Sequence, residues 1–525
     1  MKLRERSDVV VLVAWTIAVV IIAGARREFI GDGLRYVADA AAGVWKLGEP
    51  RWLLFPGLLT AWLALWRGLG VQPSTAHAIN LFLALDLLSG VIFLLALRGL
   101  LKHIQVPTGR RALAIALAGA CGPLLALSTD TAEPMVPAAL GAMGLLLAAK
   151  ARPDSDFSWY AVAGVTVICV AGLLYQGIIL ALGMLPAVMP RGSLFRRRTL
   201  LVAAAFAIGL WSGANFALAK ASSASFGETA LRFTRNGDNE LYARWVKTSS
   251  STPLVAAVLG PASGMSMPPH FTGVRAMLEG IPHRSLVSVV QALALIVGGV
   301  VFWILLGSAV VRRRGWLVAA ACAILVLPLL RPSQYSYFKF YVLLPVFVAL
   351  AAVNLKATVA ATLLALLAPL NGYLTCSSLT EGRALFAERA RAYERASAND
   401  CWVTASWIPA VPQIWPGRSC SLLATLSSGR GSAMEQLMAE QKASLKRCFR
   451  WCYCEARSVW TDDMVASRLD QIRDLALYFQ AQELLSARLL WTDATGIIVL
   501  RGQAGLDVLQ FEERARKEAC ASLSQ

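Results

Sequence analysis

The chain has 525 residues, of which 57% are apolar and 16% are charged, and its formal net charge is +18 at pH 7. A soluble domain carries about 25% charged residues, so the composition excludes an ordinary soluble protein. Much of the positive charge lies in short clusters between apolar runs, at residues 110–111, 196–198 and 312–314. Such clusters follow the positive-inside bias of membrane proteins. No known nucleic-acid-binding motif accompanies them, so we expect no nucleic-acid partner.

The apolar residues are distributed unevenly along the chain. Residues 1–375 contain repeated apolar runs, whereas residues 376–525 have the composition of a soluble domain. Crossing the hydrocarbon core of a bilayer takes about 20 apolar residues in a helix. We therefore predict an all-α polytopic membrane domain at 1–375, with about 11 transmembrane helices. A soluble mixed α/β domain at 376–525 is predicted to follow it.

In chain order, the first predicted span covers residues 8–24, and a polar to amphipathic loop at 25–75 separates it from the second span at 76–97. The next two spans, 112–127 and 134–149, flank a short acidic loop. Residues 158–190 are too many for one span, and Tyr175-Gln176-Gly177 predicts a tight hairpin within them. A second long loop is expected at 220–284. The remaining spans are predicted at 199–219, 285–310, 316–330, 340–354 and 357–375.

The basic loops predict the orientation of the chain. If the N-terminus is cytoplasmic, every strongly basic short loop falls on the cytoplasmic side. The loops 25–75 and 220–284 and the C-terminal domain then lie outside, on the periplasmic side of a bacterial inner membrane. The first apolar run also fits a cleavable signal peptide, because a basic segment precedes it and Ala23-Gly24-Ala25 follows. Its removal would leave the other orientations unchanged.

Cys376 lies at the end of the last predicted span, and six more of the ten cysteines lie in the predicted C-terminal domain. An even number in one domain is typical of disulfides in an oxidising compartment. Free thiols and a metal site are the alternatives. The cysteine spacing fits no zinc pattern well and no histidine lies nearby, so we predict no metal site. These cysteines are Cys401, Cys420, Cys448, Cys452, Cys454 and Cys520.

The first long loop contains the best candidate for catalysis. It reads Glu28-Phe-Ile-Gly-Asp32-Gly-Leu-Arg35-Tyr36, and apolar positions recur at helical spacing from residue 34. This pattern predicts an amphipathic helix lying on the membrane interface. Asp32, at its start, is either a helix N-cap or a carboxylate placed to act as a general base. Residues 52–66 are apolar but short and contain Pro56, so they predict a second interfacial or re-entrant helix.

An Asp-x-x-Arg-Tyr sequence soon after the first span, followed by two interfacial helices, resembles the GT-C superfamily of glycosyltransferases. The pattern is most similar to that of protein O-mannosyltransferases and of the lipid A aminoarabinose transferase. The loop Thr129-Asp130-Thr131-Ala-Glu133-Pro134 and the segment from Ser333 to Pro345 resemble further motifs of these families. The chain departs from the pattern at Gly33, where a second acidic residue is common, and at Glu49-Pro50-Arg51.

The resemblance implies an enzyme that moves a sugar from a polyprenyl-phosphate donor to a lipid, glycan or protein acceptor at the external face of the membrane. It implies that Asp32 is the general base and that Asp130 and Glu133 belong to the same site. The departing phosphate needs cations, and Arg51, Arg331 and Lys339 are the candidates. Tyr36, Tyr341 and His270 are further candidate residues. No cofactor is required, although the carboxylates can bind a divalent cation.

Each of these residues also has a structural interpretation. Arg331 and Lys339 can be interface anchors, and Asp130 and Glu133 can stabilise the N-terminus of the helix that follows Pro134. A lone loop histidine such as His270 is usually inert. A transporter or flippase, and a non-catalytic assembly protein that displays its C-terminal domain, are the alternative functions. Charges that cluster at span ends, without an internal repeat, argue against a transporter.

Overall fold

We describe the protein from a computed structural model of the full chain. Helices account for most of the described residues before residue 395, and the described strands come after it. The structure describes residues 6–25, 40, 54–71, 75–130, 134–151, 157–189, 197–222, 227, 260–262, 264–266, 286–312, 314–330 and 341–394, and five strands between residues 401 and 502.

The first two apolar runs form helices where they were predicted. Helix α1 (Ser7–Ala25) covers the first run. Helix α4 (Thr75–His103) covers the second and continues past it to Lys102 and His103. Cations in the last turn of a helix are favourable, because the carbonyl groups there carry partial negative charge.

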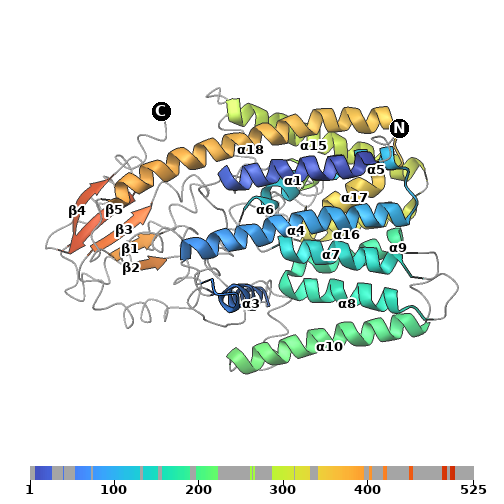
Figure 1. Cartoon of the computed structure of the whole chain (residues 1–525), viewed down its shortest axis with the longest axis horizontal. Coiled ribbons are helices and arrows are strands. Elements are labelled where there is room, and N and C mark those ends of the chain that lie inside the picture. The colour runs from blue at the N-terminus through green and yellow to red at the C-terminus, as the bar shows by residue number, and fades with distance from the viewer. Residues whose placement is uncertain are drawn as a thin grey trace.

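Helix α3 (Phe55–Gly68) is short, and Pro56 lies in its first turn, where a missing backbone N–H breaks no helical hydrogen bond. It packs on α4, with the rings of Phe55 and Phe82 5.7 Å apart, and Trp62 Nε1 donates a hydrogen bond of 3.0 Å to the carbonyl of Leu81. Figure 1 shows α3 nearly end-on while the long helices run across the picture. Its crosswise direction agrees with the predicted interfacial helix.

The predicted span at 112–127 is not one straight helix. The structure has α5 (Thr108–Gly119) and α6 (Gly122–Ser128), whose axes differ by 68°. Pro123 explains the bend, because proline has no backbone N–H and its ring clashes with the preceding helical turn.

The predicted hairpin in 158–190 is confirmed. Helix α7 (Met135–Ala149) precedes it, and α8 (Trp159–Leu174) ends at Tyr175, whose backbone is extended with φ −151° and ψ 113°. A 3₁₀-helix, η3 (Gln176–Met184), and the short α9 (Leu185–Val188) form the returning segment.

The remaining helices follow the later apolar runs, with two differences. They are α10 (Arg197–Ser222), α15 (Leu286–Val311), α16 (Gly315–Leu330), α17 (Leu344–Ala352) and α18 (Ala357–Glu394). Helix α17 is shorter than the predicted 340–354. Helix α18 continues past residue 375, because the residues beyond it are rich in Ala, Leu, Glu and Arg, which favour helix. The predicted domain boundary therefore lies inside a helix.

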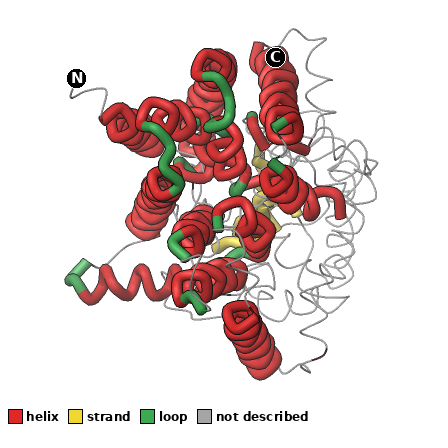
Figure 2. The backbone as a smooth tube through the Cα atoms, turned by 90° about the vertical axis from the view of Figure 1, so that its right-hand side faces the viewer, coloured by secondary structure: helices red, strands yellow, loops and turns green. Residues whose placement is uncertain are grey.

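The long helices run side by side in one bundle, which Figures 1 and 2 show from two directions. Large aromatic side chains fill its interior, among them Phe302 and Phe347, whose rings lie 5.6 Å apart. The outer surface is also apolar: Ile21 is 66% exposed and Ile296 is 64% exposed. Four of the described helices are long and apolar enough to cross a membrane, or five if α5 and α6 form one span. The chain is an integral membrane protein, and the total number of spans stays a prediction.

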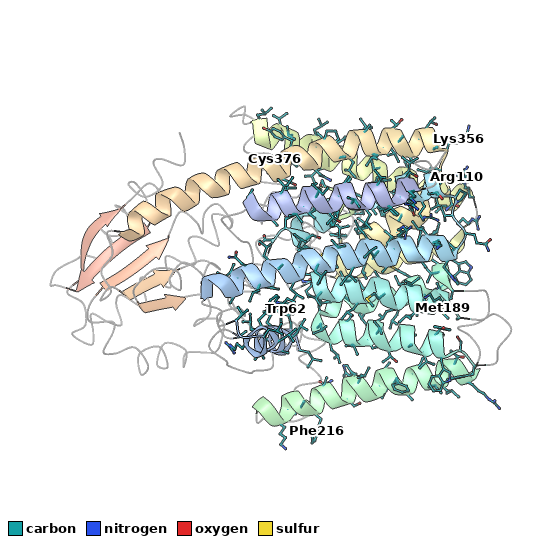
Figure 3. The ribbon with its side chains drawn as sticks, viewed as in Figure 1. Trp62, Arg110, Met189, Phe216, Lys356 and Cys376 are labelled. Atoms are coloured by element: carbon teal, nitrogen blue, oxygen red, sulfur yellow. The ribbon has the colours of Figure 1, made fainter. Side chains whose placement is uncertain are left out.

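The loops predicted to be cytoplasmic gather at one end of the bundle. Figure 3 shows Arg110, Met189 and Lys356 at this end, which we call the basic end, and Trp62, Phe216 and Cys376 toward the other. The strands lie beyond the second end, which we call the strand end (Figure 1). This grouping is the one that the predicted topology requires.

The described strands form two small sheets. Strand β1 (Cys401–Thr404) pairs in parallel with β2 (Arg418–Ser421). In the second sheet, β5 (Ile497–Gly502) lies between β3 (Cys448–Cys452) and β4 (Ala487–Thr492), and both pairings are antiparallel. The residues that connect these strands, and the side chains of the six cysteines, lie outside the described part. The mixed α/β domain and its disulfides therefore stay predictions.

Candidate functional site

Asp130 lies at the strand end of the bent pair α5–α6, two residues after α6 ends, and only 4% of it is exposed. The residues before it hold it in place. Ser128 packs so closely on Gly90 of α4 that a Cβ at position 90 would overlap with the Ser128 hydroxyl. The hydroxyl of Thr129 donates a 2.8 Å hydrogen bond to the carbonyl of Leu125. The contacts of Ser128 and Thr129 therefore fix the backbone directly before Asp130.

Tyr341 is fully buried and lies three residues before the start of α17. Its ring packs on the short segment 260–266, where a Cβ at Gly264 would lie 2.8 Å from Tyr341 Cγ. The same segment reaches the α5–α6 bend, because Met265 Sδ lies 4.0 Å from Cys121 Sγ. The structure therefore connects the elements that carry Asp130 and Tyr341 through one intervening segment.

The other candidates from the sequence lie outside the described residues. The described helices nevertheless show where their segments are attached. Helices α1 and α6 both end on the strand side of the bundle in Figure 1, and these ends begin the segments that hold Asp32 and Glu133. The candidates in question are Asp32, Tyr36, Arg51, Glu133, His270, Arg331 and Lys339.

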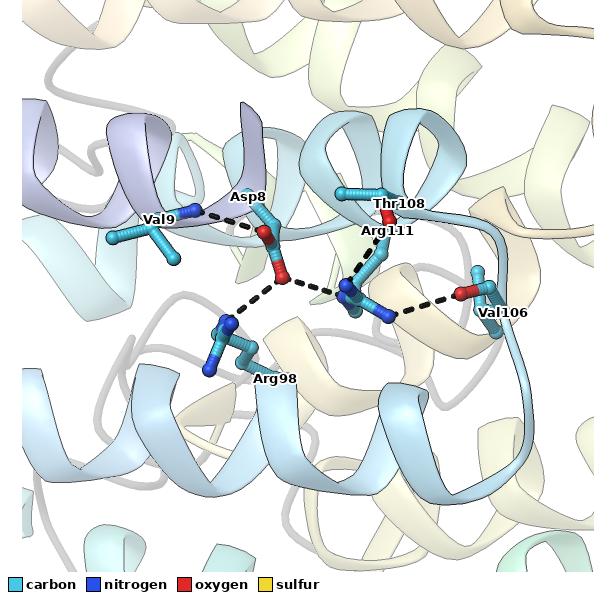
Figure 4. A network of polar contacts seen from close by, with 6 residues as sticks. All are labelled: Asp8, Val9, Arg98, Val106, Thr108 and Arg111. Carbon is cyan, nitrogen blue, oxygen red and sulfur yellow. Dashed lines mark hydrogen bonds and ion pairs between the residues drawn. The ribbon is translucent and has the colours of Figure 1, made fainter. Parts of the chain in front are cut away.

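A network of charged side chains at the basic end was not predicted from the sequence. Asp8 of α1, 1% exposed, accepts hydrogen bonds through Oδ2 from Arg98 Nε at 2.8 Å and from Arg111 Nε at 2.6 Å (Figure 4). Arg111 also donates to the carbonyl of Val106 at 3.1 Å and to the Thr108 hydroxyl at 3.3 Å. The network joins α1 to α4 and α5. An acidic residue beside an apolar run was the available sequence signal, since such a charge needs a partner.

These contacts also bear on the signal-peptide alternative for residues 8–24. Besides Asp8, the indole of Trp15 donates a 2.9 Å hydrogen bond from Nε1 to the carbonyl of Gly119. A removed α1 would leave Arg98, Arg111 and this carbonyl without these partners. The packing therefore favours an α1 that stays in the bundle.

An apolar groove of about 650 Å³ opens between the start of α3, the end of α8 and α10. Leu54, Leu173, Phe206 and Leu210 line it. The backbone N–H of Leu54 donates a 3.1 Å hydrogen bond to the carbonyl of Leu173, which fixes α3 beside α8. A groove lined by such apolar side chains can hold a hydrocarbon chain. Among the described residues, no three His, Cys, Asp or Glu side chains gather as a metal-binding group.

Neither the known protein-family models nor the curated protein sequences match this chain. Solved structures do match it. ArnT from Cupriavidus metallidurans, bound to undecaprenyl phosphate, aligns with 96% of this chain and 100% of its own chain, at a TM-score of 0.56 and 14% sequence identity. The chain has the fold of ArnT. The apo state of the same protein aligns with a TM-score of 0.45, at 15% identity, over 95% of this chain and 99% of that chain.

The similarity to ArnT confirms, at the level of the fold, the resemblance to the lipid A aminoarabinose transferase that the sequence predicted. Because the aligned residues are 14% identical, the ArnT fold alone assigns no role to any side chain.

Proposed function

We propose that the protein is a GT-C glycosyltransferase that moves a sugar from a polyprenyl-phosphate donor to an acceptor at the external face of a bacterial inner membrane. The observation that carries the proposal is the ArnT fold, which extends over 96% of this chain and 100% of that chain. ArnT was solved with undecaprenyl phosphate bound, so we assign a polyprenyl phosphate as the donor lipid. The acceptor is a lipid, a glycan or a protein.

In the proposed reaction, Asp32 takes the proton of the acceptor hydroxyl while the hydroxyl oxygen bonds to the anomeric carbon of the sugar. The bond between that carbon and the donor phosphate oxygen breaks, and its electron pair leaves with the polyprenyl phosphate. The phosphate thereby gains one negative charge, which Arg51, Arg331 and Lys339 stabilise.

Asp130 and Glu133 are proposed to form the acidic side of the same site and to orient the acceptor. The burial of Asp130 and its short connection to α6 support a fixed position for that carboxylate. Tyr36, Tyr341 and His270 are further candidates for contacts to donor or acceptor. The reaction as written requires no metal, although a divalent cation can bind to the carboxylates.

The apolar groove beside α3 is proposed to hold part of the prenyl chain. It is lined by apolar side chains of three elements and opens at the surface of the bundle, so a lipid can enter from the bilayer. The crosswise α3 suits a phosphate at headgroup depth, because interfacial helices lie at that boundary.

The proposed orientation places the N-terminus in the cytoplasm and the C-terminal domain outside. The gathering of Arg110, Met189 and Lys356 at the basic end, away from the strands, supports it (Figure 3). Short basic loops favour the cytoplasmic side. The donor site would then lie at the strand end, on the external side of the membrane.

The experiment that tests the proposal measures the release of undecaprenyl phosphate. Purified protein in nanodiscs is incubated with undecaprenyl-phosphate-linked mannose or aminoarabinose, with bacterial membranes as the acceptor source, and the released lipid is quantified by mass spectrometry. We expect release by the wild-type protein and a loss of about 10²–10⁴-fold in Asp32→Asn. Asp39→Asn, which removes a carboxylate from the same predicted helix, is the matched control and should retain activity.

The substitution also separates the two interpretations of Asp32. Asn caps a helix about as well as Asp, so a purely capping Asp32 predicts nearly normal activity in Asp32→Asn. A protein that neither binds undecaprenyl phosphate nor releases it from these donors would contradict the proposed function.

A further inference from the structure

We propose that Asn371 is a positioning residue of the proposed active site: it holds the α5–α6 bend and the segment 260–266 in one arrangement, and so fixes where Asp130 and Tyr341 lie. The proposal rests on the proposed function for its catalytic consequence. Its structural part rests on hydrogen bonds made deep in the bundle.

The bend leaves backbone carbonyl groups without their helical partners. Helix α5 ends at Gly119, and the backbone of Cys121 is extended with φ −64° and ψ 133°. The carbonyl of Gly119 would accept from residue 123 in a continuous helix, but Pro123 has no N–H. Ala120, the residue that follows α5, lies at the same bend. Inside a membrane no water replaces such bonds, so the protein has to supply donors.

Two side chains from distant parts of the chain supply these donors. Trp15 Nε1 of α1 donates to the Gly119 carbonyl at 2.9 Å. Its indole fits because position 119 is glycine: a Cβ there would lie 2.8 Å from Trp15 Cδ1. Asn371 Nδ2 of α18 donates to the carbonyl of Ala120 at 2.7 Å. The bend is thus held from two sides.

Asn371 differs from Trp15 because it also forms a hydrogen bond to a second segment, 260–266. Its Nδ2 also donates to the carbonyl of Met265 at 2.9 Å, and the residue is fully buried. A primary amide has two N–H groups, and each is directed to a different segment. A leucine of similar size could fill the same volume but could satisfy neither carbonyl.

The two bonded segments lead to two of the candidate site residues. Beyond Ala120, the seven residues of α6 end two positions before Asp130. On the other side, Gly264 is next to Met265 and packs on the ring of Tyr341. A small displacement of the Asn371 amide would therefore move both the α5–α6 bend and the segment 260–266. Because polar residues inside membrane helices are costly, they are usually kept for function.

The test begins with Asn371→Leu in full-length protein, with native cysteines as reporters. Cys121, fully buried at the bend, should be alkylated by N-ethylmaleimide at least about tenfold faster. Cys169 in α8, which is buried but makes no contact with Asn371 that the structure records, should be unchanged. Mass spectrometry of both sites distinguishes local opening from global unfolding, since unfolding exposes both cysteines.

The kinetic readout uses the undecaprenyl phosphate release assay. A misplacement of about 1 Å can lower a rate by about 10²-fold, so we expect kcat of Asn371→Leu to fall at least about tenfold. In an Asp130→Asn background the same change should cost much less, because residues that act through one another are non-additive. A purely structural role would lower the amount of folded protein and leave the kcat of the folded fraction unchanged.

Asn354→Leu is the matched control. Asn354 Nδ2 donates to the carbonyl of Leu350, four residues earlier in the chain, at 3.1 Å, so within the described part of the chain this bond joins no separate segments. Neither cysteine labelling nor kcat should change. If Asn371→Leu fails to fold, Trp15→Phe removes the other bond to the bend while keeping an aromatic ring, and it should raise Cys121 labelling and lower kcat to a smaller extent.

The outcomes separate this inference from the proposed function. Unchanged Cys121 labelling in both Asn371→Leu and Trp15→Phe would overturn the inference, as would faster labelling with an unchanged kcat. Absence of transfer by the wild-type protein would contradict the proposed function, while the cysteine labelling would still report whether Asn371 holds the bend.

Discussion

Asp8→Asn is the substitution whose effect on stability follows most directly from the structure. Asp8 is the shared acceptor of Arg98 and Arg111, at 2.8 Å and 2.6 Å, in the network that joins α1 to α4 and α5. Asn keeps the shape of the side chain and one acceptor oxygen but removes the negative charge. The change therefore leaves two guanidinium groups facing each other without their counter-charge.

The size of the loss depends on how far water can replace the carboxylate. Breaking a buried ion pair by removing one partner costs about 3–5 kcal/mol. The side chain of Arg111 is 10% exposed, whereas that of Arg98 is 30% exposed and can turn toward water. We therefore expect the lower end of the range, about 3 kcal/mol, and a fall of roughly 3 °C in the apparent melting temperature of a chain of this length.

Thermal unfolding of the purified protein, followed by tryptophan fluorescence, is the assay. Lys102→Gln, which removes an exposed charge from the same end of α4, is the matched control and should change stability by less than about 0.5 kcal/mol. Adding Arg111→Gln to Asp8→Asn should cost less than the sum of the two single changes, because the residues interact directly. An Asp8→Asn protein as stable as wild type, or strict additivity in the double variant, would refute this reasoning.

Three further predictions concern the donor site and the topology. Lys339→Met should lower kcat/KM for the undecaprenyl-phosphate-linked sugar at least about tenfold with normal expression, since the loss of one charged hydrogen bond is worth about 1.5–3 kcal/mol; an unchanged kcat/KM would remove Lys339 from the site. An N-terminal tag should be shielded from impermeant reagents in intact cells, and a C-terminal tag should react on the outside. Opposite labelling would show that the predicted orientation is wrong. Non-reducing mass spectrometry should find disulfides among the six cysteines of residues 401–520; complete alkylation of all six without reductant would show that this prediction is wrong.

The sequence predicted those parts of the fold that depend on local pattern. The apolar run at 8–24 became α1, and Tyr175 ends α8 at the predicted hairpin, because hydrophobic length and a local break are visible in any short window. The bend between α5 and α6 was missed, although Gly122-Pro123 was available as a signal. Hydropathy there stays high across the break, so a search for apolar runs treats the two helices as one.

The interactions that hold the bundle together could not be predicted in the same way. Asp8 pairs with Arg111, 103 positions away, and Asn371 bonds to Ala120, 251 positions away. A single sequence shows that a charge or an amide lies within or beside an apolar run and therefore needs a partner, but the partner depends on which helices are neighbours. For the candidate site, the sequence named Asp130 and Tyr341 but gave no indication that the segment 260–266 connects their elements.

The proposed function requires that acidic and cationic residues from separate segments form one active site at the strand end of the bundle. A cryo-electron microscopy map of the protein with undecaprenyl phosphate tests it most directly. We predict that the phosphate lies within hydrogen-bonding distance of at least one of Arg51, Arg331 and Lys339, with Asp32 and Asp130 facing the same cavity. A phosphate bound elsewhere, or a map in which Asp32, Asp130 and Lys339 lie in separate parts of the surface, would contradict the claim.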